Sequence, residues 1–189
     1  MSHPIAAGKS SFDLVDPERV LSELRLQPDT VLLDLACGIG NYALAAATVI
    51  GPAGTVYAFD LWPEGIDLLR QSARERGVPQ VRAEVADVRE PLPLPAGSCD
   101  LALMATVLHD LAAEGGGEKA LREAARLLRP GGRLVVIEFE KVDSHPGPPA
   151  AIRLAHEEVE ALVVPCGFRR ERLVPVGDPL YLLSFVREG

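Results

Sequence analysis

The chain has 189 residues, of which 48% are hydrophobic and 24% are charged, as in an ordinary soluble globular protein. Its length suits one domain with a sizeable core. The net charge of −8 argues against nucleic acid as the main partner, because phosphate contacts need a basic face. No apolar run approaches the length of a membrane span and the amino terminus lacks a signal-peptide pattern, so we expect a cytoplasmic protein.

Three cysteines, Cys37, Cys99 and Cys166, lie along the chain without a Cys-x-x-Cys spacing. This odd number suggests neither a disulfide framework nor a zinc site, so we expect reduced thiols and no bound metal. We expect residues 1–10 to form a mobile N-terminal tail and residues 11–189 to form a single domain. The oligomeric state, a homodimer included, stays open.

The first helix is predicted to start at Asp16, a good N-cap residue that is followed by Pro17 at the first helical position. The apolar positions Val20, Leu21 and Leu24 give this short helix one apolar face. We expect the helix to pack beside the first strand and to help close a ligand cleft.

The stretch from Val31 to Ala47 predicts a strand, a tight turn and a helix. Gly38 and Gly40 allow positive φ and carry no Cβ, so a ligand can lie directly against the main chain. Asp34 stands at the carboxyl end of the strand, where open α/β sheets bind their ligands. An acid there, beside free helix N–H groups, suits a ligand that carries both an amine and a carboxylate.

The second and third strands are predicted at Thr55–Asp60 and Val81–Asp87, and each ends in an acid. Asp60 is placed to accept hydrogen bonds from ribose hydroxyls, and Asp87 to hold an adenine amino group. Taken singly, an acid such as Asp34 or Asp60 has a plainer interpretation as the cap of the helix that follows. Acids at the ends of three successive strands favour the ligand interpretation.

The remaining predicted elements alternate between helices and strands. They are, in order, a helix from Pro63 stopped at Gly77, a strand at Cys99–Ala105, a flexible loop at Gly115–Gly117, a helix with Leu121, Ala124, Ala125 and Leu128 on its buried face, a turn at 129–132, a strand at Arg133–Phe139, a helix from Ile152 to Cys166, and strands near Glu171–Val176 and Leu180–Arg187. This alternation predicts an α/β fold, a single Rossmann-like doubly wound sheet of seven strands with helices on both faces. The sheet is expected to be mostly parallel, with the last strand antiparallel because a tight turn precedes it.

Four motifs occur together in a fixed order: the glycine turn, the acids that end the second and third strands, and an Arg-Pro-Gly-Gly turn within Leu121–Val136. In these motifs the sequence resembles the class I S-adenosylmethionine-dependent methyltransferases, specifically the small branch similar to the ubiquinone/menaquinone-biosynthesis methyltransferases. The resemblance covers roughly Leu14 to Phe185. It implies S-adenosylmethionine as cofactor, S-adenosylhomocysteine as product and a small-molecule acceptor.

The resemblance also implies which residues hold the cofactor. They are Asp34, Ala36, Gly38 and Gly40 at the amino acid tail and sulfonium, Asp60 at the ribose, Leu61 on the adenine face, Asp87 and the backbone of Val88 at the adenine edge, and Thr106 on the side of the methyl group. One departure is that Ala36-Cys37 stands where many family members have glycine. Because Gly38 and Gly40 remain, we expect the cofactor still to fit.

The chemistry asks little of the protein, because methyl transfer is an in-line displacement that positioning alone accelerates. A base is needed only when the acceptor must lose a proton. His109, after the fourth strand, is the best candidate, and its plainer interpretation is a cap on the segment that begins there. Glu138, near the end of the fifth strand, is a candidate to orient the substrate or act as base, the alternative being an ion pair with a neighbouring arginine. Carbon, oxygen and nitrogen acceptors all stay open.

Two alternatives to a methyltransferase stay open at this point. An NAD-dependent oxidoreductase would use the same turn and Asp60, with Ala43 as its third small residue, but would leave the Arg-Pro-Gly-Gly turn unexplained. A non-catalytic S-adenosylmethionine-binding module, such as a sensor, would bind the cofactor and never form S-adenosylhomocysteine.

Overall fold

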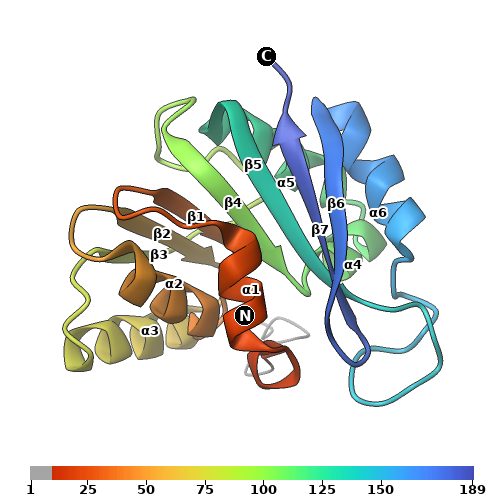
Figure 1. Ribbon diagram of the computed structural model, residues 1–189, viewed down its shortest axis with the longest axis horizontal. Helices are drawn as coiled ribbons and strands as arrows, with labels where there is room; N and C mark the ends of the chain where they lie inside the picture. Colours follow the sequence, from red (N-terminus) through yellow and green to blue (C-terminus); the bar gives the residue numbers. More distant parts are fainter. Residues whose placement is uncertain (1–9) are drawn as a thin grey trace.

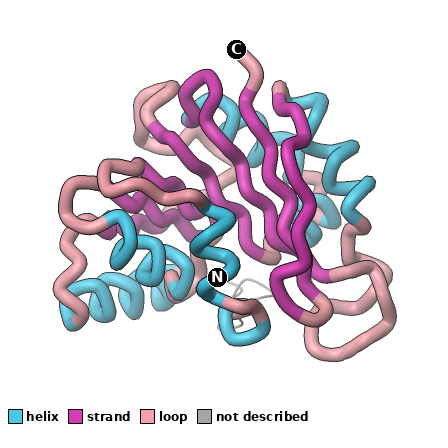
Figure 2. Tube along the Cα trace, viewed as in Figure 1, coloured by secondary structure: helices cyan, strands magenta, loops and turns pink. Residues whose placement is uncertain are grey.

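The computed structural model describes residues 10–189, which form one sheet with helices on both sides (Figures 1 and 2). The predicted mobile tail at residues 1–10 lies outside the described residues except for Ser10. Seven strands form the sheet in the order β3-β2-β1-β4-β5-β7-β6. They are β1 (Val31–Leu35), β2 (Thr55–Asp60), β3 (Val81–Val85), β4 (Cys99–Ala105), β5 (Leu128–Phe139), β6 (Phe168–Gly177) and β7 (Leu180–Arg187).

The helices divide between the two faces of this sheet. They are α1 (Pro17–Leu24), α2 (Asn41–Ile50) and α3 (Pro63–Glu75) on one face, and α4 (Leu108–Ala113), α5 (Gly117–Leu127) and α6 (His156–Val163) on the other, with single 3-10 turns η1 (Phe12–Leu14) and η2 (Val164–Cys166). Within the described part of the chain, no helix is long and apolar enough to cross a membrane.

The strand pairing confirms the predicted fold class. From β3 to β5 every neighbouring pair is parallel, and β7 runs antiparallel to both β5 and β6. β1 lies between β2 and β4, so the strand order reverses there. Open α/β sheets bind ligands at the carboxyl ends of the strands beside such a switch point. The predicted glycine turn and strand-end acids therefore lie at the expected edge.

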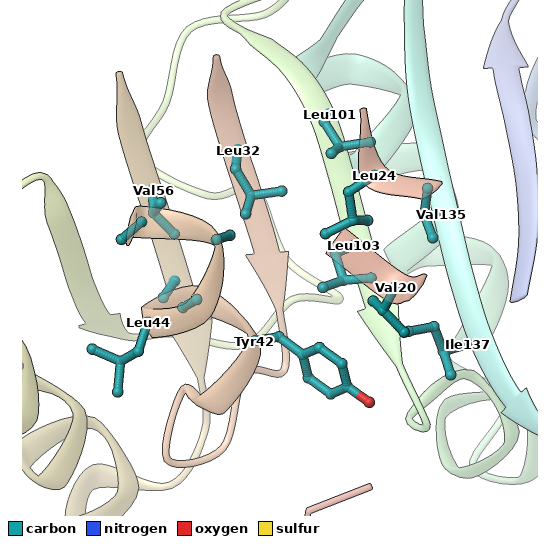
Figure 3. Packing of buried hydrophobic residues seen from close by; sticks show 14 of the residues in the cluster. Val20, Leu24, Leu32, Tyr42, Leu44, Val56, Leu101, Leu103, Val135 and Ile137 are labelled. Carbon is teal, nitrogen blue, oxygen red and sulfur yellow. The ribbon is translucent and has the colours of Figure 1, made fainter. Parts of the chain in front are cut away.

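Alternate residues of each central strand face different cores. Leu32 of β1 packs in the layer of α1 and α2, whereas its neighbour Leu33 packs in the layer of α4 and α5. Figure 3 shows Val20 and Leu24 of α1 directed at the sheet beside Val135. Because both faces are covered, these strands are mostly apolar, and the buried acids Asp34 and Glu138 are exceptions near their carboxyl ends.

The start of α1 follows its sequence signals. Asp16 is the N-cap, and its Oδ1 accepts a hydrogen bond from the Arg19 N–H at 3.1 Å. Pro17 occupies the first helical position, where its missing N–H costs nothing. Val20 and Leu24 are 1% and 2% exposed. They face β4 and β5, beside Leu103 and Val135 (Figure 3), whereas the sequence predicted packing beside the first strand.

Several predicted boundaries were wrong, and β3 ends at Val85, two residues before Asp87. A helix, α4, occupies Leu108–Ala113, where none was predicted, and the loop of glycines is shorter because α5 begins at Gly117. The Arg-Pro-Gly-Gly turn bulges out within β5, between the pairs Cys99–Leu128 and Leu101–Arg133.

The last helix also starts later than its apolar spacing predicted. Ile152 lies in the preceding loop, and Ala155 is the N-cap in extended conformation with ψ 157°. The Glu158 side chain accepts a hydrogen bond from the Ala155 N–H at 2.8 Å, which fixes the helix start at His156.

Candidate active site

The glycine turn after β1 has the predicted left-handed backbone. Gly38 and Gly40 adopt φ +56° and +75°. A Cβ at Gly40 would collide with the Leu69 side chain of α3, whereas a Cβ at Gly38 would meet no atom within 4 Å. The backbone at Gly38 is therefore open to close approach by a ligand. Ala36 also adopts a left-handed φ of +57°, at the position where the resembled family often has glycine.

Asp34 is the residue of this edge that is most in need of a partner. It is 1% exposed, and its Oδ2 has no hydrogen-bond partner among the described residues. Burial and then the charge of Asp60 raise its pKa to about 7, although the backbone of Ala43 opposes this. A buried carboxylate oxygen without a donor suits a ligand that brings a cation.

Asp60 fixes the shape of the glycine turn. Its Oδ2 accepts a hydrogen bond from the Gly38 N–H at 2.7 Å, and its Oδ1 accepts one from the Trp62 N–H at 2.8 Å. Each carboxylate oxygen has two lone pairs, so ribose hydroxyls can bind there as well. The neighbouring Leu61 is 47% exposed, which suits the face of a flat apolar group. The sequence pattern did not predict that Asp60 also stabilises the glycine turn by accepting a hydrogen bond from Gly38.

The third strand-end acid, Asp87, is held in an ion pair. Arg89 donates from Nε at 2.8 Å and from Nη2 at 2.9 Å to its carboxylate, and Arg89 also reaches Glu114 at 2.9 Å. The Arg89 hydrogen bond keeps the pKa of Asp87 below its ordinary value. The adjacent Val88 is 4% exposed. The carboxylate of Asp87 is therefore already paired with a cation inside the protein, unlike that of Asp34.

A chain of hydroxyl groups crosses the carboxyl ends of β1 and β4. Thr106, with a left-handed φ of +53°, places Oγ1 3.1 Å from Ser11 Oγ. Ser11 Oγ in turn lies 3.0 Å from the Tyr42 hydroxyl, and the Phe12 and Tyr42 rings meet edge to face. Sequence reasoning missed Ser11, because its partners are 31 and 95 residues away along the chain.

His109 and Glu138 form a buried pair, although they are 29 residues apart. His109 is 4% exposed and Glu138 0% exposed. Glu138 Oε2 lies 2.7 Å from His109 Nδ1, and Oε1 accepts a hydrogen bond from the His109 backbone N–H at 3.0 Å. Glu138 therefore also caps α4, whose own N-cap residue Val107 has no side-chain cap. The alternative that Glu138 pairs with an arginine is wrong.

The electrostatics of this pair set the protonation of the imidazole. Burial lowers the pKa of His109, but the hydrogen bond and charge of Glu138, with the charge of Asp110, outweigh burial and raise that pKa above its ordinary value of 6.5. With Nδ1–H donated to Glu138, the neutral ring keeps its lone pair on Nε2. Nε2 lies 3.5 Å from Asp110 Oδ1. The geometry is that of a base oriented by a buried acid.

Together, the sheet order and the glycine turn with its strand-end acids define a class I methyltransferase fold. Residues 33–136, more than half of the chain, match the methyltransferase domain family. The chain belongs to this family.

Two curated relatives and one solved structure illustrate the likeness. The chain is 34% identical to the ubiquinone/menaquinone biosynthesis C-methyltransferase UbiE of Ectopseudomonas mendocina over 61% of its own length and 44% of that protein. It is 33% identical to the nocamycin O-methyltransferase of Saccharothrix syringae over 75% of its length and 44% of that protein. It thus spans less than half of these relatives. A SAM-dependent methyltransferase structure from Aquifex aeolicus is 28% identical, with a TM-score of 0.85 over 95% of this chain and 93% of that one.

This family and fold imply S-adenosylmethionine as the cofactor and S-adenosylhomocysteine as the product. The residues present fit that cofactor. The unpartnered Oδ2 of Asp34 is a buried acceptor for an ammonium group, and the open backbone at Gly38 leaves room beside it. The NAD-dependent alternative loses its support, because its sheet order is 3-2-1-4-5-6, whereas here an antiparallel β7 is inserted between β5 and β6.

Proposed function

We propose that the protein transfers a methyl group from S-adenosylmethionine to a small organic acceptor. The observation that carries this proposal is the buried oxygen of Asp34, which has no partner and lies next to the open glycine turn. An isolated buried carboxylate oxygen is costly unless a ligand pairs with it. A sulfonium amino acid brings the ammonium that this oxygen lacks.

The cofactor-binding residues take the roles that the sequence predicted. Asp34 accepts from the ammonium group, and Gly38 lets the amino acid tail lie against the main chain. Asp60 accepts from the ribose hydroxyls with the lone pairs that its two backbone hydrogen bonds leave free. Leu61 covers one adenine face, and Asp87 with the Val88 backbone meets the adenine edge. Ala36, Gly40 and Thr106 complete the lining on the sulfonium side.

S-adenosylmethionine, when bound, supplies an electrophilic methyl carbon. His109 Nε2 takes the proton of the acceptor, and Glu138 holds the imidazole in the tautomer that leaves Nε2 free. Glu138 is therefore a positioning residue, and His109 is the catalytic base. Such a base serves a hydroxyl acceptor best, because a neutral amine is already nucleophilic. The similarity to an O-methyltransferase over 75% of this chain supports this choice.

The test has two stages. Calorimetric titrations with S-adenosylmethionine, S-adenosylhomocysteine and NAD should show binding of the first two only. A screen of small hydroxylated acceptors, read out as S-adenosylhomocysteine formed, should then find turnover. Binding of NAD alone would overturn the cofactor assignment, and cofactor binding without turnover of any acceptor would favour the non-catalytic binding module.

The setting of the reaction follows from charge and cysteine chemistry. We propose a cytoplasmic enzyme that does not act on nucleic acid, supported by the net charge of −8 and by three cysteines that are all free thiols. A homodimer stays a prediction, which sedimentation equilibrium tests directly.

A further inference from the structure

A pocket of about 260 Å³ opens beside His109. It lies between α4 and the loop that joins β5 to α6 (Figure 1). Its apolar wall includes Ala112, Ala113 and Ile152, and its charged lining consists of Lys141, Arg153 and Glu158. The volume lies just below the usual range for ligand pockets, roughly 300 to 1,000 Å³, so it suits a molecule with a single ring.

Arg153 gives this pocket a positive charge that forms no ion pair with an acid among the described residues. The side chain is buried, with the residue 1% exposed, and it stacks on the Phe139 ring. Its hydrogen bonds go to one hydroxyl and five carbonyl oxygens of the loop at 140–148. All of these acceptors are uncharged. A buried cation is usually paired with an acid, so this arrangement leaves a field that favours an anion nearby.

Lys141 is the cation of the pocket that is open to solvent. Its Nζ donates to Glu158 Oε1 at 2.7 Å and to Oε2 at 2.8 Å, which leaves its third N–H for a ligand. The side chain is 38% exposed. Glu158 keeps the Ala155 N–H as a second partner, so it stays satisfied if Lys141 turns toward a ligand. The lining residues thus bring two cations and one carboxylate to this end of the pocket, while the carboxylates of Asp110 and Glu138 lie at the other end, against His109.

His109 closes the other end of the pocket. Because its Nδ1 faces Glu138, Nε2 is the nitrogen left for an acceptor, and the acceptor hydroxyl would meet it beside Asp110 Oδ1, which lies 3.5 Å away. We propose that this pocket binds the methyl acceptor and that the acceptor is a small hydroxylated carboxylate, with its hydroxyl on His109 and its carboxylate on Lys141. The acceptor hydroxyl gives its proton to Nε2 and takes the methyl group on oxygen, so that a methyl ether and S-adenosylhomocysteine are the products. This assignment rests on the proposed function.

Three phenols that share one ring and differ in charge test the pocket. They are para-hydroxyphenylacetate, which is anionic, para-ethylphenol, which is neutral, and tyramine, which is cationic. Each is titrated calorimetrically into the protein saturated with S-adenosylhomocysteine. We expect the anion to bind about tenfold more tightly than the neutral phenol, as one charged hydrogen bond provides, and tyramine to bind weakest.

Variants separate the pocket from a general charge effect. Lys141→Met should remove the preference for the anion, whereas the control Lys119→Met, an exposed lysine of α5 paired with Glu90, should keep it. Glu158→Gln frees Lys141 and keeps an oxygen for the Ala155 N–H, so the anion should bind more tightly. No preference for the anion, a preference that survives Lys141→Met, or no binding of any phenol overturns the assignment.

The same phenols are also assayed for S-adenosylhomocysteine formation from S-adenosylmethionine. Binding that depends on Lys141 without turnover of any acceptor would leave the pocket assigned and sink the proposed methyl transfer. Turnover of para-ethylphenol and para-hydroxyphenylacetate with equal efficiency would leave the methyl transfer standing and overturn the choice of a carboxylate.

Discussion

At the carboxyl end of β1, the buried acid Asp34 keeps one oxygen without a partner, whereas near the end of β5 both oxygens of the buried acid Glu138 are bonded to His109. The two acids lie in the same sheet and are equally inaccessible, at 1% and 0% exposure. We propose that the first accepts a charged ligand from outside the protein. The second acid, Glu138, is already paired with His109 inside the protein.

This difference matches the demands on the two halves of the site. The cofactor brings a fixed positive charge, so an unpaired acid can wait for it at a cost to the stability of the free protein. The acceptor brings a proton to be removed, and a base works best when its tautomer and orientation are set beforehand. Substitutions that keep shape and remove one of these properties should therefore affect the two halves differently.

The largest effect is expected from His109→Asn. The asparagine amide can still donate to Glu138, so folding and capping of α4 are kept, but Nε2 is lost. We expect kcat to fall by about 10²- to 10⁴-fold, as for loss of a general base, with cofactor affinity unchanged. Steady-state kinetics and calorimetry measure the two quantities. His156→Asn, on α6, is the matched control. A kcat of wild-type size in His109→Asn would show that no base is used.

Asp34→Asn should lower the affinity for the cofactor and raise the free energy of unfolding of the free protein. Loss of a charge-assisted hydrogen bond of roughly 1.5–3 kcal/mol lowers affinity for S-adenosylmethionine by about 10- to 100-fold. In the free protein the pKa of Asp34 rises from 3.8 to about 7, so its destabilising effect grows as the pH rises between these values. Asp34→Asn should therefore raise the unfolding free energy by on the order of 2 kcal/mol at pH 8 and by little at pH 4.

Thermal unfolding between pH 4 and pH 8, without cofactor, checks the expected change in stability. Asp67→Asn, a change at an exposed acid of α3, is the matched control and should alter neither quantity. If Asp34→Asn binds S-adenosylmethionine as tightly as the wild type, the cofactor ammonium does not use this oxygen.

Glu138→Gln tests the proposed acceptor half of the site, the His109–Glu138 pair, through the pH dependence of kcat. In the wild type, Glu138 holds the pKa of His109 above 6.5, so activity that needs the neutral imidazole rises with pH through that raised value. Without the carboxylate, burial and the charge of Arg153 lower the pKa of His109 and only the charge of Asp110 still raises it, so the pKa falls. The acidic limb of the kcat profile should move to lower pH, with kcat reduced about tenfold at the plateau.

Stability should follow the same linkage. The charged His109–Glu138 pair stabilises the wild type fully below the unfolded pKa of about 6.5 and loses this contribution as the pH rises through the higher folded value. Glu138→Gln should flatten that slope in urea titrations between pH 5 and 8. A plateau that falls with no movement of the acidic limb would mean that Glu138 serves only to cap α4.

The sequence predicted the local geometry of the proposed cofactor half better than the side-chain pairing in the proposed acceptor half, and the reason is distance along the chain. The signals at Asp34, Gly38 and Gly40 are local, since a strand, a turn and a helix follow one another within 20 residues. The strand bounds of β2, β4 and β7 follow equally from local apolar runs. The His109–Glu138 pair needs two strands in register and lies outside any local pattern.

The helices that were misplaced share this cause. α4 has six residues and no capping side chain of its own. Glu138 of β5 caps it instead, so no local sequence signal marks its start. The start of α6 is displaced because Arg153, just before it, is anchored to the carbonyls of the preceding loop. Apolar spacing at Ile152 extends the helical pattern into a segment that these polar contacts hold in another conformation.

The smallest effects are expected at Ala36 and Gly38, two residues of the glycine turn with left-handed backbone, at φ +57° and +56°. Ala36→Gly relieves steric strain of about 1–2 kcal/mol and adds about 0.5–1 kcal/mol of unfolded-state entropy, so it should stabilise the free protein by roughly 0.5–1 kcal/mol. Gly38→Ala should destabilise it by a similar amount, although its Cβ meets no protein atom. In calorimetric titrations only Gly38→Ala should also lower the affinity for the cofactor, because the methyl group of the new alanine fills space proposed for the amino acid tail. Equal affinities in the two variants would place the tail away from Gly38.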